Sequence, residues 1–206
     1  MNNGIVVEHL NKSFGRQEVL SDVNFSIEPG KSLGVVGNNG SGKTVLMKCI
    51  CGFIKPDSGT IYVDGFRIGK DVDFPKDLGV IIETPGFIPY LTGYQNLKIL
   101  ASLKGKIGNK EIREALIRVG LNPNNRKNVA KYSLGMRQRL GIAQAIMEDP
   151  KVLVLDEPFN GLDKAGVSHM RELIIEMKSR EKAILLASHN AADIELLCDN
   201  VMEMGR

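Results

Sequence analysis

Glycine-rich residues with a lysine and a threonine at their end form the most informative stretch of the chain: Gly37, Asn38, Asn39, Gly40, Ser41, Gly42, Lys43 and Thr44. This order fits G-x-x-x-x-G-K-[ST], the phosphate-binding loop called Walker A. The glycines permit tight turns, so that backbone N–H groups point at the α- and β-phosphates, and a following helix adds its positive dipole end. We expect Lys43 to reach the β- and γ-phosphates and assist catalysis, and the Thr44 hydroxyl to ligate Mg²⁺. An ordinary glycine-rich turn is the alternative, but a predicted buried strand at 33–36 and helix at 44–51 favour the nucleotide site.

Two carboxylates follow the predicted buried strand 152–155. A buried strand delivers side chains to the carboxyl edge of a parallel sheet, where ligands bind in this architecture. We expect Asp156 to hold Mg²⁺, directly or through water, and Glu157, which faces the other way, to polarise a water for in-line attack on the γ-phosphate. The alternative is an acidic pair that caps the next helix. The upstream phosphate-binding loop favours the catalytic interpretation.

A third motif, Tyr132-Ser133-Leu134-Gly135-Met136, resembles the signature of ATP-binding cassette (ABC) ATPases, usually Leu-Ser-Gly-Gly-Gln. Ser133 and Gly135 hold its two most specific positions, whereas Leu134 and Met136 depart from it. Ser133 is also suited to be an N-cap, with free amides behind it that form an anion site. An ordinary capped helix is the alternative. The resemblance implies that Ser133 and Gly135 contact nucleotide held by a partner subunit.

Further matches to the same family follow in order over essentially the full chain. Asp163, at the end of an Asn-Gly-Leu-Asp run, resembles the D-loop, which touches the partner subunit. His189 resembles the switch histidine, which would contact the γ-phosphate and hold the attacking water or Glu157 in place. Phe14 matches the aromatic that stacks on adenine. A structural histidine and a core or surface phenylalanine are the alternatives.

Glu83 departs from the family, which normally has glutamine at the strand end before the helical insert. A charged carboxylate would ligate Mg²⁺ or its water more strongly than an amide would. A solvated strand-end acid is the alternative. The segments Ile-Glu-Thr-Pro-Gly-Phe at 82–87 and Leu-Thr-Gly-Tyr-Gln-Asn-Leu at 91–97 look similar to exporters of the bacitracin-resistance and lantibiotic-immunity group.

These motifs need a scaffold, and hydrophobic periodicity indicates an α/β fold. Strands that alternate with helices predict a mainly parallel sheet with helices on both faces. Together with the motifs, this indicates a P-loop NTPase (RecA-like) core with an N-terminal antiparallel β subdomain and an inserted α-helical subdomain. We expect strands at 4–10, 23–27, 33–36, 59–63, 78–82, 152–155, 183–187 and 201–204. We expect helices at 44–51, 94–103, 110–119, 134–147, 164–179 and 191–197.

The resemblance implies one ABC ATPase domain over residues 1–206. Within it we expect the β subdomain and the Walker A part of the core at 1–86, and the helical insert at 87–131. The signature helix and the rest of the core are expected at 132–206.

Composition argues against several classes of protein. No apolar run approaches the ~20 residues that cross a bilayer, and the N-terminus lacks the features of a signal peptide, so we expect a soluble, cytosolic chain. A net charge of +3 without a long basic run argues against nucleic acid as a partner. The three cysteines do not suggest a disulfide framework, and Cys49 and Cys51 are expected to be reduced core thiols.

The resemblance implies an ATP- and Mg²⁺-dependent ATPase subunit that powers transport through a separate transmembrane permease at the cytoplasmic face of the membrane. Its cargo is expected to be an exported antimicrobial peptide or small molecule. Two cassettes, expected to be identical, would pack head to tail with two ATPs between them. A soluble ABC ATPase without a permease is the alternative, disfavoured because long coiled coils, zinc cysteines and tandem cassettes are not evident. Asp156, Glu157 and His189 disfavour a non-hydrolysing module.

Overall fold

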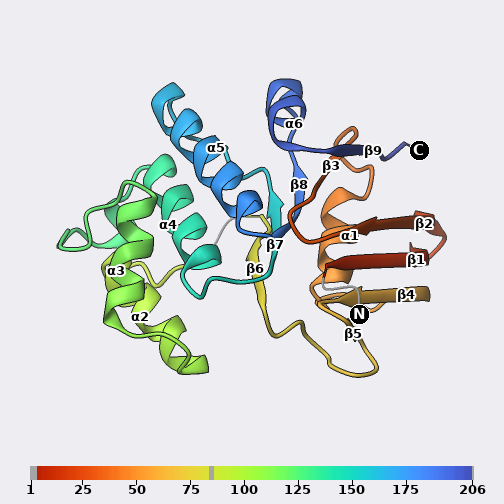
Figure 1. The fold of residues 1–206 in the computed structure, drawn as a ribbon, viewed down its shortest axis with the longest axis horizontal. Helices are drawn as coiled ribbons and strands as arrows, with labels where there is room; N and C mark the ends of the chain where they lie inside the picture. Colours follow the sequence, from red (N-terminus) through yellow and green to blue (C-terminus); the bar gives the residue numbers. More distant parts are fainter. Residues whose placement is uncertain (1–3, 84–85, 206) are drawn as a thin grey trace.

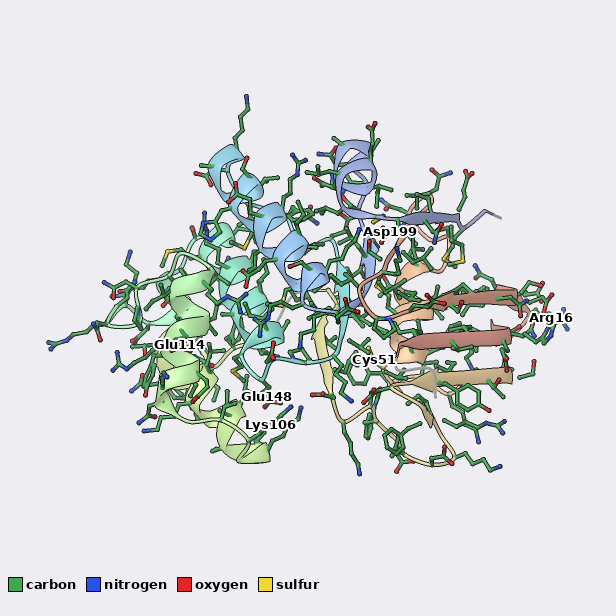
Figure 2. All side chains as sticks on the ribbon, in the orientation of Figure 1. Arg16, Cys51, Lys106, Glu114, Glu148 and Asp199 are labelled. Atoms are coloured by element: carbon green, nitrogen blue, oxygen red, sulfur yellow. The ribbon has the colours of Figure 1, made fainter. Side chains whose placement is uncertain are left out.

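An antiparallel sheet forms from the first part of the chain in the computed structural model, which describes residues 4–83 and 86–205. Its strand order is β2 (Gln17–Ile27), β1 (Ile5–Phe14), β4 (Ser58–Val63) and β5 (Phe66–Arg67). The predicted strands 4–10 and 23–27 were too short. The added residues, 11–14 and 17–22, belong to the outer half of the β1–β2 hairpin, where Leu20 is the one buried residue and the pairing register shifts twice, so no regular alternation marks them. Figure 2 shows Arg16 at the tip of this hairpin.

A five-stranded sheet forms the centre of the molecule, in the order β6 (Leu78–Ile81), β7 (Val152–Asp156), β8 (Ala183–Ala187), β3 (Ser32–Val36) and β9 (Asn200–Glu203). All of its strand pairs are parallel. Neighbouring residues of β7 alternate between two cores, with Val152 and Val154 on one face and Leu153 and Leu155 on the other. The prediction of a parallel sheet covered on both faces is therefore confirmed.

Helices cover the two faces of this sheet unequally. Helix α1 (Lys43–Ile50) packs between the two sheets, whereas α4 (Leu134–Ile146), α5 (Lys164–Ser179) and α6 (Ala191–Leu197) share the core on the opposite face. Figure 1 shows α2 (Gly93–Lys104) and α3 (Asn109–Arg118) at the end of the molecule away from the antiparallel sheet. A short 3₁₀ helix, η1 (Val129–Lys131), precedes α4 in the chain. All six predicted α-helices are confirmed within one residue at each end.

The parallel register places the ends of four strands at one edge of the sheet. Leu155 of β7 lies opposite Ile81 of β6 and Leu186 of β8, and β8 continues the pairing to β3. The segments that leave these strands therefore begin side by side, although they lie far apart in sequence. No helix within residues 4–83 and 86–205 has the length and apolarity that a bilayer crossing needs.

The cysteines are free, and Cys49 on α1 and Cys51 at the C-cap of that helix are fully buried, as predicted. Figure 2 shows Cys51 in the interior, at the end of α1. Burial raises the pKa of Cys49 to about 11 and that of Cys51 to about 12, and it raises the pKa of the half-buried Cys198 to about 11.

Because the thiolate is the reactive form, we expect all three native thiols to react with a disulfide reagent such as DTNB at pH 8 at least ~100-fold more slowly than in the unfolded chain. The reason is the two-unit or larger rise in pKa from 9.0, added to steric protection. Absorbance of the released thiol, followed with and without guanidinium, measures both rates. One thiol reacting at its unfolded rate in the native protein would contradict this.

Candidate functional site

A cleft of about 610 Å³ opens at the edge where the four strands end. Most residues of the first two motifs line it, together with Phe14, Glu83 and residues for which the sequence predicted no role in this cleft. The predicted site residues are Phe14, Asn39, Gly40, Gly42, Lys43, Thr44, Glu83, Asp156 and Glu157, and the others are Val19, Val45, Leu134, Arg137, Gln138 and Asn160.

The phosphate-binding loop connects β3 to α1, as its motif predicts. Gly42 is the N-cap of α1 and has a φ of 99°, in the left-handed region that favours glycine. A Cβ on Gly42 would also lie 2.9 Å from the Val19 carbonyl oxygen, so a larger residue is excluded on two grounds. The Lys43 Nζ donates to the carbonyl oxygens of Gly37 (2.6 Å) and Asn38 (3.1 Å), which places its charge on the loop. Loop and helix start together present amides and a cation to the cleft.

The second residue of α1 is joined to the end of β7. The Thr44 hydroxyl donates to Asp156 Oδ2 at 2.7 Å, and Asp156 is buried. A hydroxyl and a carboxylate are oxygen ligands of the kind Mg²⁺ accepts when phosphate and water supply the rest. Among the described residues, no three His, Cys, Asp or Glu side chains form a metal-binding cluster. The Thr44 hydroxyl and the Asp156 carboxylate therefore fit Mg²⁺ better than a metal whose ligands all come from protein side chains.

Glu157 and His189 meet across the ends of β7 and β8. His189 Nδ1 lies 2.7 Å from Glu157 Oε2, and the imidazole is 74% exposed. The Glu157 N–H donates to the Ala187 carbonyl at 2.9 Å, which ties its backbone to β8. The Gln138 amide donates to the Pro158 carbonyl at 3.0 Å and to the Glu157 carbonyl at 3.3 Å. The backbone of Glu157 is therefore fixed from α4 and from β8, and its carboxylate contacts His189 at the cleft.

The signature motif lies at the start of α4. Unlike the first two motifs, it contributes few residues to the cleft of its own chain. Ser133 is the N-cap, as predicted, and its hydroxyl accepts from the Met136 N–H at 3.2 Å. Among the described residues that line the cleft, Leu134 is present but Ser133 and Gly135 are not. A Cβ on Gly161 would lie 2.4 Å from Leu134 Cγ, and one on Gly135 would lie 2.7 Å from the Gly161 carbonyl oxygen. The start of α4 therefore packs on the segment 160–163 of the same chain.

Asp163 ends that segment and is the N-cap of α5. Its Oδ1 accepts from the Gly166 N–H at 2.9 Å and lies 3.6 Å from Arg139 Nη2. Its side chain is nevertheless largely exposed. These contacts fix the segment that the sequence relates to the D-loop without covering it.

Phe14 lies at the end of β1 and lines the cleft with a half-exposed ring. Lys12 Nζ lies 5.3 Å from the centroid of that ring, and the same amine pairs with Asp57 at 2.8 Å. A cation over an aromatic ring is an attractive contact, so Lys12 helps to hold the ring in place. The exposed part of the ring offers a π face on which a base can stack.

Glu83 leaves β6 at the same edge, but its carboxylate is engaged elsewhere. Its Oε1 pairs with Lys48 Nζ at 2.7 Å. Sequence reasoning missed Lys48, although its position four residues after Thr44 predicts that both lie on the same face of α1. Thr84 and Pro85, which belong to the exporter-like segment at 82–87, lie outside the described residues.

Comparisons with known proteins agree with this geometry. The ABC transporter family model matches residues 20–160. The chain is 41% identical over 197 residues to the bacitracin transport ATP-binding protein BcrA of Enterococcus faecalis, covering 95% of this chain and 64% of BcrA. It is 38% identical over 193 residues to the lantibiotic transport ATP-binding protein SrtF of Streptococcus pyogenes, covering 94% of this chain and 83% of SrtF.

The fold is also similar to that of a solved ATP-binding subunit of an ABC transporter. That structure superposes with a TM-score of 0.87 at 30% identity, covering 97% of this chain and 85% of the other. The similarity to BcrA and SrtF confirms the sequence-based resemblance to the bacitracin and lantibiotic group.

Proposed function

This chain belongs to the ABC transporter family, and on that basis we propose that it binds and hydrolyses ATP to power a transporter whose membrane-spanning part is a separate permease. The observation that carries the proposal is the pairing of Glu157 with His189 beside the Thr44–Asp156 hydrogen bond, all at the mouth of the phosphate-binding loop. A hydrolytic site needs a phosphate cradle, a metal-binding pair of oxygens and a base in one place.

Binding of ATP follows from the loop and from Phe14. Lys43 exchanges its bonds to loop carbonyls for phosphate oxygens, which are stronger acceptors because they are charged. The amides of residues 37–44 hold the remaining phosphate oxygens, and Phe14 stacks on adenine. We propose that Thr44, Asp156 and Glu83 hold Mg²⁺, which when bound neutralises charge on the phosphates. ATP and Mg²⁺ are therefore the expected substrate and cofactor.

Hydrolysis is assigned to Glu157 and His189. The Glu157 carboxylate accepts a proton from a water that attacks the γ-phosphate in line. His189 orients this carboxylate and lies at the open side of the cleft, where a γ-phosphate would enter its reach. Gln138 keeps the backbone of residue 157 in place, so the base does not need to move during the reaction.

We propose that the active unit is a head-to-tail pair of identical cassettes. Ser133 and Gly135 do not line the cleft of their own chain, and Asp163 is exposed, so these residues are free to meet nucleotide and loop on a second copy. ATP in each interface would link the phosphate-binding loop of one copy to the capped start of α4 of the other. Closure with ATP and opening after hydrolysis then drive transport, since a ligand favours the state in which it makes more contacts.

The wider assignments follow from the family. We propose one ABC ATPase domain over 1–206, with a helical insert at 87–131 that transmits the closing motion between the Glu83 segment and the permease. The chain would sit at the cytoplasmic face of the membrane through that permease. Export of an antimicrobial peptide or small molecule is supported by the likeness to BcrA and SrtF, whose names give bacitracin and lantibiotic transport.

A phosphate-release assay tests the proposal on the purified chain. We expect release that requires Mg²⁺ and whose rate per molecule rises with protein concentration, because a complete site needs two copies. Release that stays constant per molecule would contradict the paired site. No release at any concentration would indicate a nucleotide-gated module that does not hydrolyse.

A further inference from the structure

Lys48 is a cation that pairs with the cleft-lining Glu83, and neither the proposed binding of ATP nor its hydrolysis uses this lysine. It lies one helical turn after Thr44 on α1, so the two side chains leave the same face of the helix. Thr44 donates to Asp156, and Lys48 pairs with Glu83. One face of α1 therefore presents two donors to two carboxylates.

The two carboxylates come from neighbouring strands. Strands β6 and β7 are parallel, and Ile81 lies opposite Leu155, so the chain reaches Glu83 and Asp156 at the same edge. The position of Lys48 is fixed by its own backbone, because its carbonyl accepts from the Phe53 N–H at 2.8 Å and the Ile54 N–H at 3.2 Å. The backbone of Lys48 is thus held at the end of α1, while Glu83 lies two residues after β6 with a φ of 58°.

We propose that Lys48 holds the Glu83 carboxylate in the nucleotide-free protein and competes with the divalent cation for it. This inference rests on the proposed function, in which Glu83 is a metal contact. The ion pair is short, but its side chains are 28% (Lys48) and 63% (Glu83) exposed, and such pairs are weak enough to exchange. Arrival of the metal and nucleotide then transfers the carboxylate from the ammonium group to the cation. The uncharged glutamine usual at this position makes no ion pair with a lysine, so the exchange depends on the glutamate.

A double-mutant cycle tests this with a binding measurement. The readout is the free Mg²⁺ concentration that gives half of the metal-dependent gain in affinity for a fluorescent, non-hydrolysable ATP analogue. Because Lys48→Met removes the competitor, it should lower that concentration by about two- to five-fold, the range expected for one exposed ion pair. Glu83→Gln should raise it, and Lys48→Met added to Glu83→Gln should have no further effect.

Two matched variants control for charge and folding. Lys48→Arg keeps the cation and should stay close to the wild type, and Lys110→Met removes a charge from an 81%-exposed side chain of α3 without effect. A Lys48→Met shift of the same size in the Glu83→Gln background would overturn the proposal, as would no shift in the wild-type background. Unchanged metal dependence in Glu83→Gln would also overturn the proposal, because it would show that Glu83 does not contact the metal. Failure of the proposed function looks different, because the wild type would then bind no analogue or gain nothing from Mg²⁺.

Discussion

Lys43→Ala is expected to weaken ATP binding by about 10- to 100-fold, the loss that follows when one charge-assisted contact to phosphate is removed. In the nucleotide-free protein Lys43 bonds only to exposed loop carbonyls, which water can satisfy after the substitution. The thermal midpoint of the free protein should therefore stay within a few degrees of the wild type. Titration with a fluorescent ATP analogue measures the affinity.

The matched control is Lys110→Ala, which removes the same charge from a largely exposed side chain on α3. It should leave ATP affinity as it is. Equal affinity of Lys43→Ala and the wild type would remove the basis for assigning residues 37–44 to phosphate binding.

Glu157→Gln is expected to bind ATP with nearly wild-type affinity but to hydrolyse it at least 100-fold more slowly, in the range typical of a lost general base. Glutamine has the shape of glutamate and can still contact His189, but it cannot accept the proton of the attacking water. Since the ATP-bound state is no longer consumed, paired cassettes should accumulate. Phosphate release gives the rate, and size-exclusion chromatography with ATP gives the fraction of pairs.

The control for this second substitution is Glu114→Gln on α3. Figure 2 shows Glu114 on the helical end of the molecule, away from Cys51 and the antiparallel sheet. It should hydrolyse ATP at the wild-type rate and form no stable pair. Normal turnover in Glu157→Gln would place the base at another residue.

The central sheet could be predicted from sequence because its strands are short apolar runs between clear breaks. Strands such as 183–187 are buried on both faces, and helix 164–179 shows a regular apolar stripe. The β1–β2 hairpin could not be predicted to its full length. Its outer half is mostly exposed and its pairing contains bulges, so backbone hydrogen bonds, not a hydrophobic pattern, define it.

In the candidate site, the positions of the motif residues could be predicted from the sequence, but the contacts between motifs could not. Each motif residue that follows a strand lies at the expected edge, because parallel strands deliver their ends together. The contacts between motifs were not predictable, since they join segments far apart in sequence. Examples are the Lys48–Glu83 ion pair, the bond from Gln138 to the Pro158 carbonyl, and the packing of Leu134 on Gly161.

Leu134, which departs from the family signature, makes a contact in the structure that a glycine could not make. Its side chain is 54% exposed, lies against Gly161 and lines the cleft of its own chain. The consensus glycine offers no such contact. Leu134 therefore ties the start of α4 to the D-loop-like segment, a coupling that the sequence alone did not indicate.

The shared site between two copies is tested most directly by mixing two inactive variants. Lys43→Ala disables the phosphate-binding loop, and Ser133→Asp adds a negative charge that repels the γ-phosphate while keeping a good N-cap for α4. If each ATP is held by the loop of one copy and the signature of the other, a mixed pair contains one intact site. The mixture should then release phosphate well above the mean of the two variants measured alone. Release no higher than that mean would show that both residues serve the same chain and would contradict the paired-cassette account.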